Sequence, residues 1–162
     1  MENTNDNKTS LPYINKVKKY NLISAYIDMF YKFDNFKGRS RRSEFFYATL
    51  LDIIIIVAYM IIFIFLGYFG YEYDFLTASE TERLGIMYKF VYLIYCIITF
   101  IPRLSLTVRR LHDTGRSGWW LLVGLIPYGV FAVLLFLVTE SDPCINKYGT
   151  NPKGRYCNKK VE

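Results

Sequence analysis

A charged loop between two long apolar runs holds the residues best suited to chemistry. The stretch RRLHDTGRSGWW contains three arginines, the single histidine of the chain and an aspartate. Arg109 and Arg110 precede Asp113 by four and three residues, so each guanidinium can meet the carboxylate on one helical turn. Such a cation cluster can bind a phosphate or a lipid headgroup. A structural interpretation competes with this one, and we prefer it: Asp113 neutralises one arginine and caps the turn.

The residue types present give little support to catalysis. No obvious serine or cysteine nucleophile accompanies His112, so we interpret it as a structural hydrogen-bonding residue. One histidine cannot supply a two-histidine zinc site, and the sequence has no His-Glu-x-x-His helix, phosphate-binding loop or dinucleotide fingerprint. We therefore expect a non-enzymatic protein that uses no metal and no cofactor.

Two further charges interrupt apolar segments. Asp52 lies early in the first apolar run, and Arg103 lies late in the second. An ionisable residue inside a membrane is a functional candidate by default. Because both charges fall in the same half of the membrane, they can pair. We favour a structural pair that fixes helix registry over a proton or ion pathway.

Three apolar runs must position these charges, and they cover residues 45–69, 86–108 and 119–138. A helix needs about 20 mostly apolar residues to cross roughly 30 Å of hydrocarbon. The first and third runs meet that length, whereas Lys89 and Arg103 interrupt the second. The first run is apolar on all sides, which argues against a soluble core. We interpret all three runs as transmembrane helices.

The third run contains a break at GLIPYG, residues 124–129. Pro127 cannot donate a hydrogen bond to a helix, and Gly129 permits a turn. At about 1.5 Å per residue, the run still provides roughly one bilayer crossing. We prefer a kinked single span. The alternative is a re-entrant hairpin, which would return the C-terminal tail to the cytoplasm.

Lysine and arginine are distributed unevenly around these runs. They are abundant before residue 45 and in the 109–120 loop, whereas the loop between the first two runs is acidic. The positive-inside rule therefore places the N-terminus and the 109–120 loop in the cytoplasm. A net charge of +6 suits anionic lipid headgroups. Nucleic acid is a poor fit, because the basic residues flank membrane segments and form no stripe.

The segments outside the apolar runs are short. Residues 1–20 are polar, and we expect them to be flexible. Residues 21–33 have the apolar face of an interfacial amphipathic helix, and docking on the ends of the spans is an equal alternative. Residues 153–162 form a basic tail. The sequence leaves open whether Cys144 and Cys157 pair, which would depend on the side of the membrane.

A Gly-Arg-Ser motif precedes both the first and the third run, in KGRSRRSEFFY and TGRSGWW. Serine can cap an entering helix, and aromatic pairs such as Trp119 and Trp120 favour the headgroup zone. Arginine can pair with lipid phosphate through two hydrogen bonds. The candidate phosphate-binding residues are Arg39, Arg42, Arg109, Arg110 and Arg116.

The stretches FDNFKGRSRRSEFFY, RRLHDTGRSGWWLL, IPYG and NKYGTNP together resemble the bacterial inner-membrane family called domain of unknown function 805, the YhaH-like proteins. The resemblance covers about residues 21–152 and departs at Phe46, where tryptophan is usual. It implies a single membrane domain over these residues but no reaction. The motif positions are Gly38, Arg39, Arg42, Glu44, Arg109, Arg110, His112, Asp113, Ser117, Gly118, Trp119, Asn146, Tyr148, Gly149 and Pro152.

The sequence thus predicts an all-α, multi-pass protein of the bacterial inner membrane. Its arginine-rich cytoplasmic face is expected to bind anionic membrane lipids or a partner protein. The alternative is a small transporter or channel component that uses Asp52 and Arg103. That function would require a homo-oligomer or a membrane-protein partner, because three spans enclose little pore.

Overall fold

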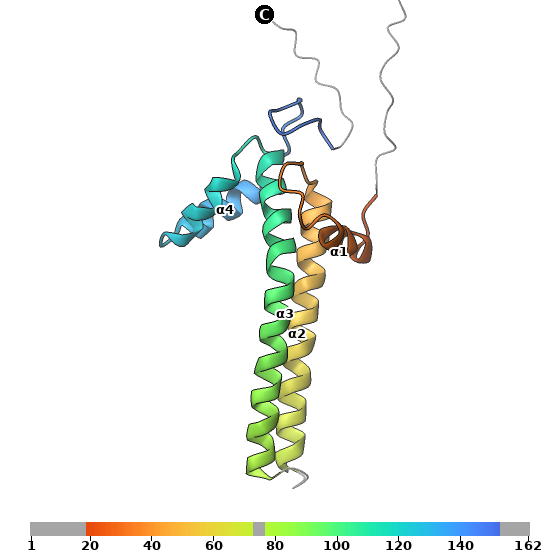
Figure 1. Cartoon of the computed structure of the whole chain (residues 1–162), viewed down its shortest axis with the longest axis vertical. Helices are drawn as coiled ribbons and strands as arrows, with labels where there is room; N and C mark the ends of the chain where they lie inside the picture. Colours follow the sequence, from red (N-terminus) through yellow and green to blue (C-terminus); the bar gives the residue numbers. More distant parts are fainter. Residues whose placement is uncertain (1–18, 73–76, 153–162) are drawn as a thin grey trace, which may run out of the picture.

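The computed structural model describes residues 19–72 and 77–152, and regular structure in these ranges is helical throughout (Figure 1). The elements are α1 (Leu22–Tyr31), α2 (Arg42–Glu72), α3 (Ala78–Asp113), the 3₁₀-helix η1 (Gly118–Leu125) and α4 (Gly129–Val138). The predicted all-α fold is therefore confirmed for the described residues. The predicted N-terminal and C-terminal tails lie almost entirely outside these ranges.

Helices α2 and α3 run side by side along most of the molecule, and we call them the long helix pair (Figure 1). They contain 31 and 36 residues, which corresponds to about 46 and 54 Å of helix. Only 6% of the most apolar window of each is buried, whereas the core helix of a soluble domain would be mostly buried. Both are long and apolar enough to cross a membrane, and they contain the predicted spans 45–69 and 86–108.

The third apolar run does not form the single kinked span that we preferred. It forms a hairpin of η1 and α4, which lie against each other beside one end of the long helix pair (Figure 1). Tyr128 adopts a left-handed conformation with φ 66°, and the Gly129 amide donates to the Ile126 carbonyl at 2.9 Å. With 10 residues, α4 is about 15 Å long, half of a hydrocarbon crossing.

The close packing at Gly129 explains why the chain turns back there. A Cβ atom at this position would overlap the backbone carbonyl of Val123, so the turn requires glycine. Pro127 removes one helical donor in the same turn. The hairpin, which is the alternative prediction to a kinked span, therefore returns the chain to the end of the molecule where it entered.

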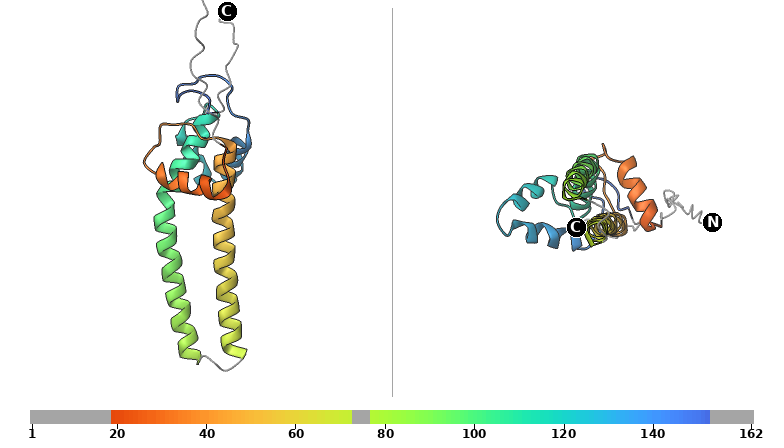
Figure 2. Two further views of the ribbon diagram at one scale, coloured as in Figure 1. Left: turned by 90° about the vertical axis from the view of Figure 1, so that its right-hand side faces the viewer. Right: turned by 90° about the horizontal axis from the view of Figure 1, so that it is seen from below.

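Helix α1 lies across the long helix pair, on the side opposite to the hairpin (Figure 2). Ala25 and Met29 of α1 pack against Ala48 and Leu106 and are almost completely buried. The outer face of α1 is apolar as well, with Ile23 exposed by 68%. The predicted amphipathic helix is thus present, and it docks on the long helix pair while it keeps an exposed apolar face.

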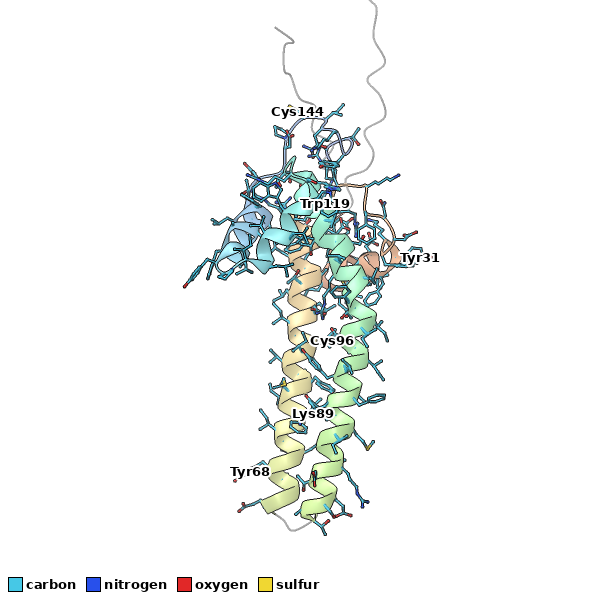
Figure 3. All side chains as sticks on the ribbon, turned by 60° about the vertical axis from the view of Figure 1, so that its left-hand side comes forward. Tyr31, Tyr68, Lys89, Cys96, Trp119 and Cys144 are labelled. Carbon is cyan, nitrogen blue, oxygen red and sulfur yellow. The ribbon has the colours of Figure 1, made fainter. Side chains whose placement is uncertain are left out.

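We call residues 19–44 and 109–152 the head, because they gather at the end of the molecule that carries α1 and the hairpin (Figure 1). Figure 3 shows Trp119 and Cys144 in the head, and it shows Lys89 and Tyr68 towards the far end of the long helix pair. The apolar centre of the head is small and contains Leu111, Val133 and Leu137. Polar contacts therefore hold much of the head together.

Candidate functional site: a buried arginine cluster in the head

The carboxylate of Asp113 binds two arginines at the end of α3. One of its oxygens lies 3.0 Å from Arg39 Nη2, and the other lies 2.5 Å from Arg110 Nη1. The Asp113 and Arg110 side chains are fully buried, and that of Arg39 is 2% exposed. The predicted pair between Arg110 and Asp113 is confirmed. We call these three residues the arginine cluster.

Residues 139–152 follow α4, and we call them the tail; their backbone carbonyls accept further hydrogen bonds of Arg39. Its Nη1 donates to the Cys144 carbonyl at 2.9 Å and to the Gly149 carbonyl at 3.2 Å, and its Nη2 donates to the Asp142 carbonyl at 2.6 Å. A buried guanidinium is tolerated when most of its donors are paired in this way. Arg39 therefore joins the segment before α2 to the segment after α4.

Arg110 makes the corresponding connection from α3. Its Nε donates to the Leu137 carbonyl at 2.9 Å, and its Nη2 donates to the Thr139 carbonyl at 2.5 Å. These are carbonyls at the end of α4, which lack partners within the helix. The cluster thus fixes the point where the chain leaves the hairpin.

Arg109 belongs to a second ionic group. Its Nη1 lies 3.1 Å from Glu44, and Lys32 lies 3.5 Å from the same carboxylate. Arg109 does not pair with Asp113 as its four-residue spacing suggested, because it projects towards α2 instead. Its Nε and Nη2 are buried and have no hydrogen-bond partner among the described residues. Burial and the charge of Glu44 raise the pKa of the Tyr20 phenol nearby.

His112 lies beyond the predicted crossing segment 86–108 and is packed against the tail. Its ring stacks on Tyr148 with centroids 3.7 Å apart, and the Asn146 side chain donates to its carbonyl at 2.9 Å. Burial lowers the pKa of His112, although a hydrogen bond with the Gly38 backbone opposes this shift. These contacts hold His112 against Asn146 and Tyr148, so its role in this structure is structural.

The tail bends back at Gly149. Asn146 and Gly149 exchange backbone hydrogen bonds of 3.2 and 3.0 Å, and Gly149 has φ 124°, a conformation that favours glycine. Pro152 accepts from Arg41, whose Nε lies 2.6 Å from the Pro152 carbonyl. Sequence reasoning missed Arg41 because its position in the RSRR run gave no sign of which arginine faces inward.

The burial of these side chains corrects the predicted phosphate-binding face. Arg39, Arg109 and Arg110 are enclosed by protein and are not available to a headgroup in this conformation. Arg42 remains 34% exposed, although it donates to the Thr139 carbonyl at 3.2 Å. The Arg116 guanidinium lies 3.9 Å from the centre of the Phe136 ring. Both of these arginines flank the base of the hairpin.

The start of the hairpin follows the predicted pattern. The Ser117 side chain caps η1 by accepting from the Trp119 amide at 3.4 Å. Gly118 allows the close approach of α3, because a Cβ there would lie 2.9 Å from the Val108 side chain. Trp119 is 77% exposed, whereas Trp120 packs edge-on against Phe136.

Asp52 and Arg103 form the predicted ion pair, with 2.6 Å between Arg103 Nη2 and Asp52 Oδ1. Tyr95 also donates to this carboxylate oxygen at 2.6 Å, and Tyr26 of α1 lies 3.3 Å from the Tyr95 hydroxyl. The pair is thus connected to the head through α1. Sequence reasoning missed both tyrosines because one aromatic residue among many carries no distinguishing pattern.

A second contact within the long helix pair also escaped prediction. The Tyr59 and Tyr88 rings stack with centroids 3.9 Å apart. Each hydroxyl donates to the backbone carbonyl of the other tyrosine at 2.6 Å. This reciprocal contact joins α2 to α3 without charge.

The cysteines divide between the two regions. Cys96 in α3 is free. Cys144 is disulfide-bonded, while Cys157 lies outside the described residues. Such a bond persists in an oxidising compartment and is reduced in the cytoplasm. The redox state of Cys144 in cells is therefore informative about the side on which the head lies.

Comparison with known proteins identifies the family. The family model described as "Protein of unknown function (DUF805)" matches residues 33–150, a range that includes the arginine cluster and excludes α1. Inner membrane protein YhaI of Escherichia coli (strain K12) is 32% identical over 129 residues, covering 79% of this chain and 94% of the relative. Inner membrane protein YhaH of the same strain is 31% identical, with 79% and 95% covered. No solved structure matches the chain. With nearly three quarters of its length matched, the chain belongs to the DUF805 family.

Proposed function

We propose that this protein is a non-enzymatic, multi-pass inner-membrane protein whose head lies on the cytoplasmic face and binds anionic lipid headgroups. The names of its relatives support the inner membrane. The two long apolar helices support two crossings. The excess of lysine and arginine before α2 and after α3 supports a cytoplasmic head.

One observation carries the lipid-binding part of the proposal. Helix α1 and the hairpin extend to opposite sides of the long helix pair at its head end (Figure 2). Both expose large apolar side chains, with Ile23 at 68%, Leu125 at 82% and Tyr128 at 83%. Exposed apolar faces are stabilised when they lie at the boundary between headgroups and acyl chains, because the acyl chains cover them.

Two arginines outside the arginine cluster lie beside the hairpin, where they can contact lipid headgroups. Arg42 and Arg116 flank the base of the hairpin, next to Thr139 and Phe136. Each cation near an anionic surface contributes about 1 kcal/mol. In this proposal, the arginine cluster shapes the head, while Arg42 and Arg116 contact the headgroups.

The two tryptophans provide a direct test, because both belong to η1. The full chain is reconstituted into phosphatidylcholine vesicles that contain a trace of dansyl-phosphatidylglycerol or, separately, dansyl-phosphatidylcholine. We expect stronger energy transfer from tryptophan to the anionic probe. The excess should weaken with added salt and in the double variant R42Q/R116Q. A matched double variant, K37Q/K147Q, should retain it.

Equal transfer to both probes in the wild-type chain would contradict the anionic preference. No transfer to either probe would contradict the interfacial position of the hairpin. The transporter alternative is less well supported by the geometry, because Asp52 and Arg103 pair with each other and the Tyr59 and Tyr88 hydroxyls donate to backbone carbonyls.

A further inference from the structure

A cavity of about 130 Å³ lies between the two long helices. Its lining is apolar and is formed by Ile55, Ile56, Tyr59, Val91, Tyr92 and Tyr95. Val91 is 52% exposed, so the cavity opens at the surface of the long helix pair. In the proposed membrane position this opening faces hydrocarbon.

The two ends of the cavity differ in chemistry. Tyr95 lines the cavity and also donates to Asp52, which pairs with Arg103. The Arg103 side chain is 35% exposed, while its Nε is buried and has no partner within residues 19–72 and 77–152. At the other end, Tyr59 lines the cavity and stacks on Tyr88. A partly exposed cation therefore lies at one end, and aromatic rings close the other.

The position of α1 indicates the depth of this site. Tyr26 of α1 reaches the Tyr95 hydroxyl at 3.3 Å, and Tyr95 donates to Asp52 at 2.6 Å, so the Asp52–Arg103 pair lies within reach of one side chain of α1. An interfacial helix lies about 5–10 Å into the boundary between headgroups and acyl chains. Arg103 is thus close enough to a phosphate to pair with it, and the cavity extends from there towards the bilayer centre.

We infer that this cleft binds one phospholipid, with its phosphate on Arg103 and one acyl chain in the cavity. A guanidinium matches phosphate oxygens in charge and geometry. An acyl chain gives the apolar lining the contacts that an empty cavity lacks. The phosphate is the group that all phospholipids share, so the site needs no net negative charge on the lipid. The inference rests on the proposed membrane position but is independent of Arg42 and Arg116.

The experiment uses native mass spectrometry of the full chain, released from nanodiscs that contain a single phosphatidylcholine species. We expect one retained phosphatidylcholine per chain. I55W places an indole in the cavity and excludes the acyl chain. It should therefore reduce the retained fraction about tenfold, which corresponds to about 1.4 kcal/mol of binding free energy. I54W adds the same indole at a neighbouring position that is 47% exposed and does not line the cavity, so it should retain the lipid.

A second arm tests the phosphate contact. Nanodiscs are prepared with phosphatidylcholine and a diacylglycerol that carries the same acyl chains but no phosphate. The wild-type chain should retain phosphatidylcholine about tenfold more, as expected for a charge-assisted hydrogen bond. In R103Q this preference should disappear, while circular dichroism should show unchanged helix content.

Equal retention by I55W and I54W would overturn the acyl-chain site. Equal retention of the two lipids by the wild-type chain would overturn the phosphate contact. A lipid-free dimer would show that a second copy of the chain occupies the cleft instead, and this result would also overturn the inference. None of these results affects the tryptophan energy-transfer test, which reports on the hairpin.

Discussion

The head and the long helix pair are stabilised in opposite ways. In the head, Asp113, Glu44 and a series of tail carbonyls bind arginines that are almost fully buried. In the long helix pair, one ion pair and the contact between Tyr59 and Tyr88 join helices whose other faces are exposed and apolar. The head therefore satisfies its own polar groups, whereas the helix pair depends on surroundings that cover its apolar surface.

The largest expected effect is the loss of the arginine cluster. D113A would leave Arg39 and Arg110 buried without their shared carboxylate, which costs about 3–5 kcal/mol when a buried pair is broken. Thermal unfolding of the purified protein in detergent measures this loss. E140A is the matched control, because Glu140 is 79% exposed and lies 4.0 Å from Arg42. Similar stability of the two variants would contradict a structural role for the cluster.

A smaller effect is expected at the ion pair of the long helix pair. D52A or R103A alone should destabilise the protein by about 2 kcal/mol, less than for a fully enclosed pair because the Arg103 side chain is 35% exposed. The double variant D52L/R103L should recover most of the loss, because it leaves no unpaired charge. Equal loss of folded protein in all three variants would exclude a purely structural pair.

The uncharged contact should contribute less again. Y59F and Y88F each remove one hydroxyl donor while they retain the stacked rings, so each should cost about 1 kcal/mol. Chemical unfolding followed by circular dichroism provides the measurement. Y68F serves as the control, since Tyr68 is 67% exposed. A loss in Y68F as large as in the other two would show that the reciprocal contact has no special role.

The smallest effect concerns pH in the head. Burial lowers the pKa of His112, so the folded state favours the neutral ring and loses stability as pH falls through the unfolded value of about 6.5. H112F keeps a ring against Tyr148 but cannot be protonated. The difference in melting temperature between wild type and H112F should therefore grow in favour of H112F between about pH 7.5 and 5.5. A difference that is independent of pH would contradict this assignment.

The sequence predicted what depends on composition and local spacing. Run length indicated α2 and α3, and three-residue spacing indicated the pair between Arg110 and Asp113. The same local argument failed for Arg109, because its partner Glu44 is distant in sequence. The preference for a third span failed because run length cannot show that Gly129 packs against the Val123 carbonyl. The backbone carbonyls that bind Arg39 could not be predicted, because every residue has a carbonyl and the side-chain types do not mark the ones used.

The central claim is that the hairpin returns the tail to the cytoplasmic side, where the arginine cluster binds it. A C-terminal fusion to green fluorescent protein or to alkaline phosphatase, expressed in Escherichia coli, tests this claim most directly. We expect a fluorescent and phosphatase-negative cell in which the Cys144 disulfide is reduced, because the cytoplasm keeps thiols reduced. An active phosphatase fusion without fluorescence would place the tail outside and contradict the account.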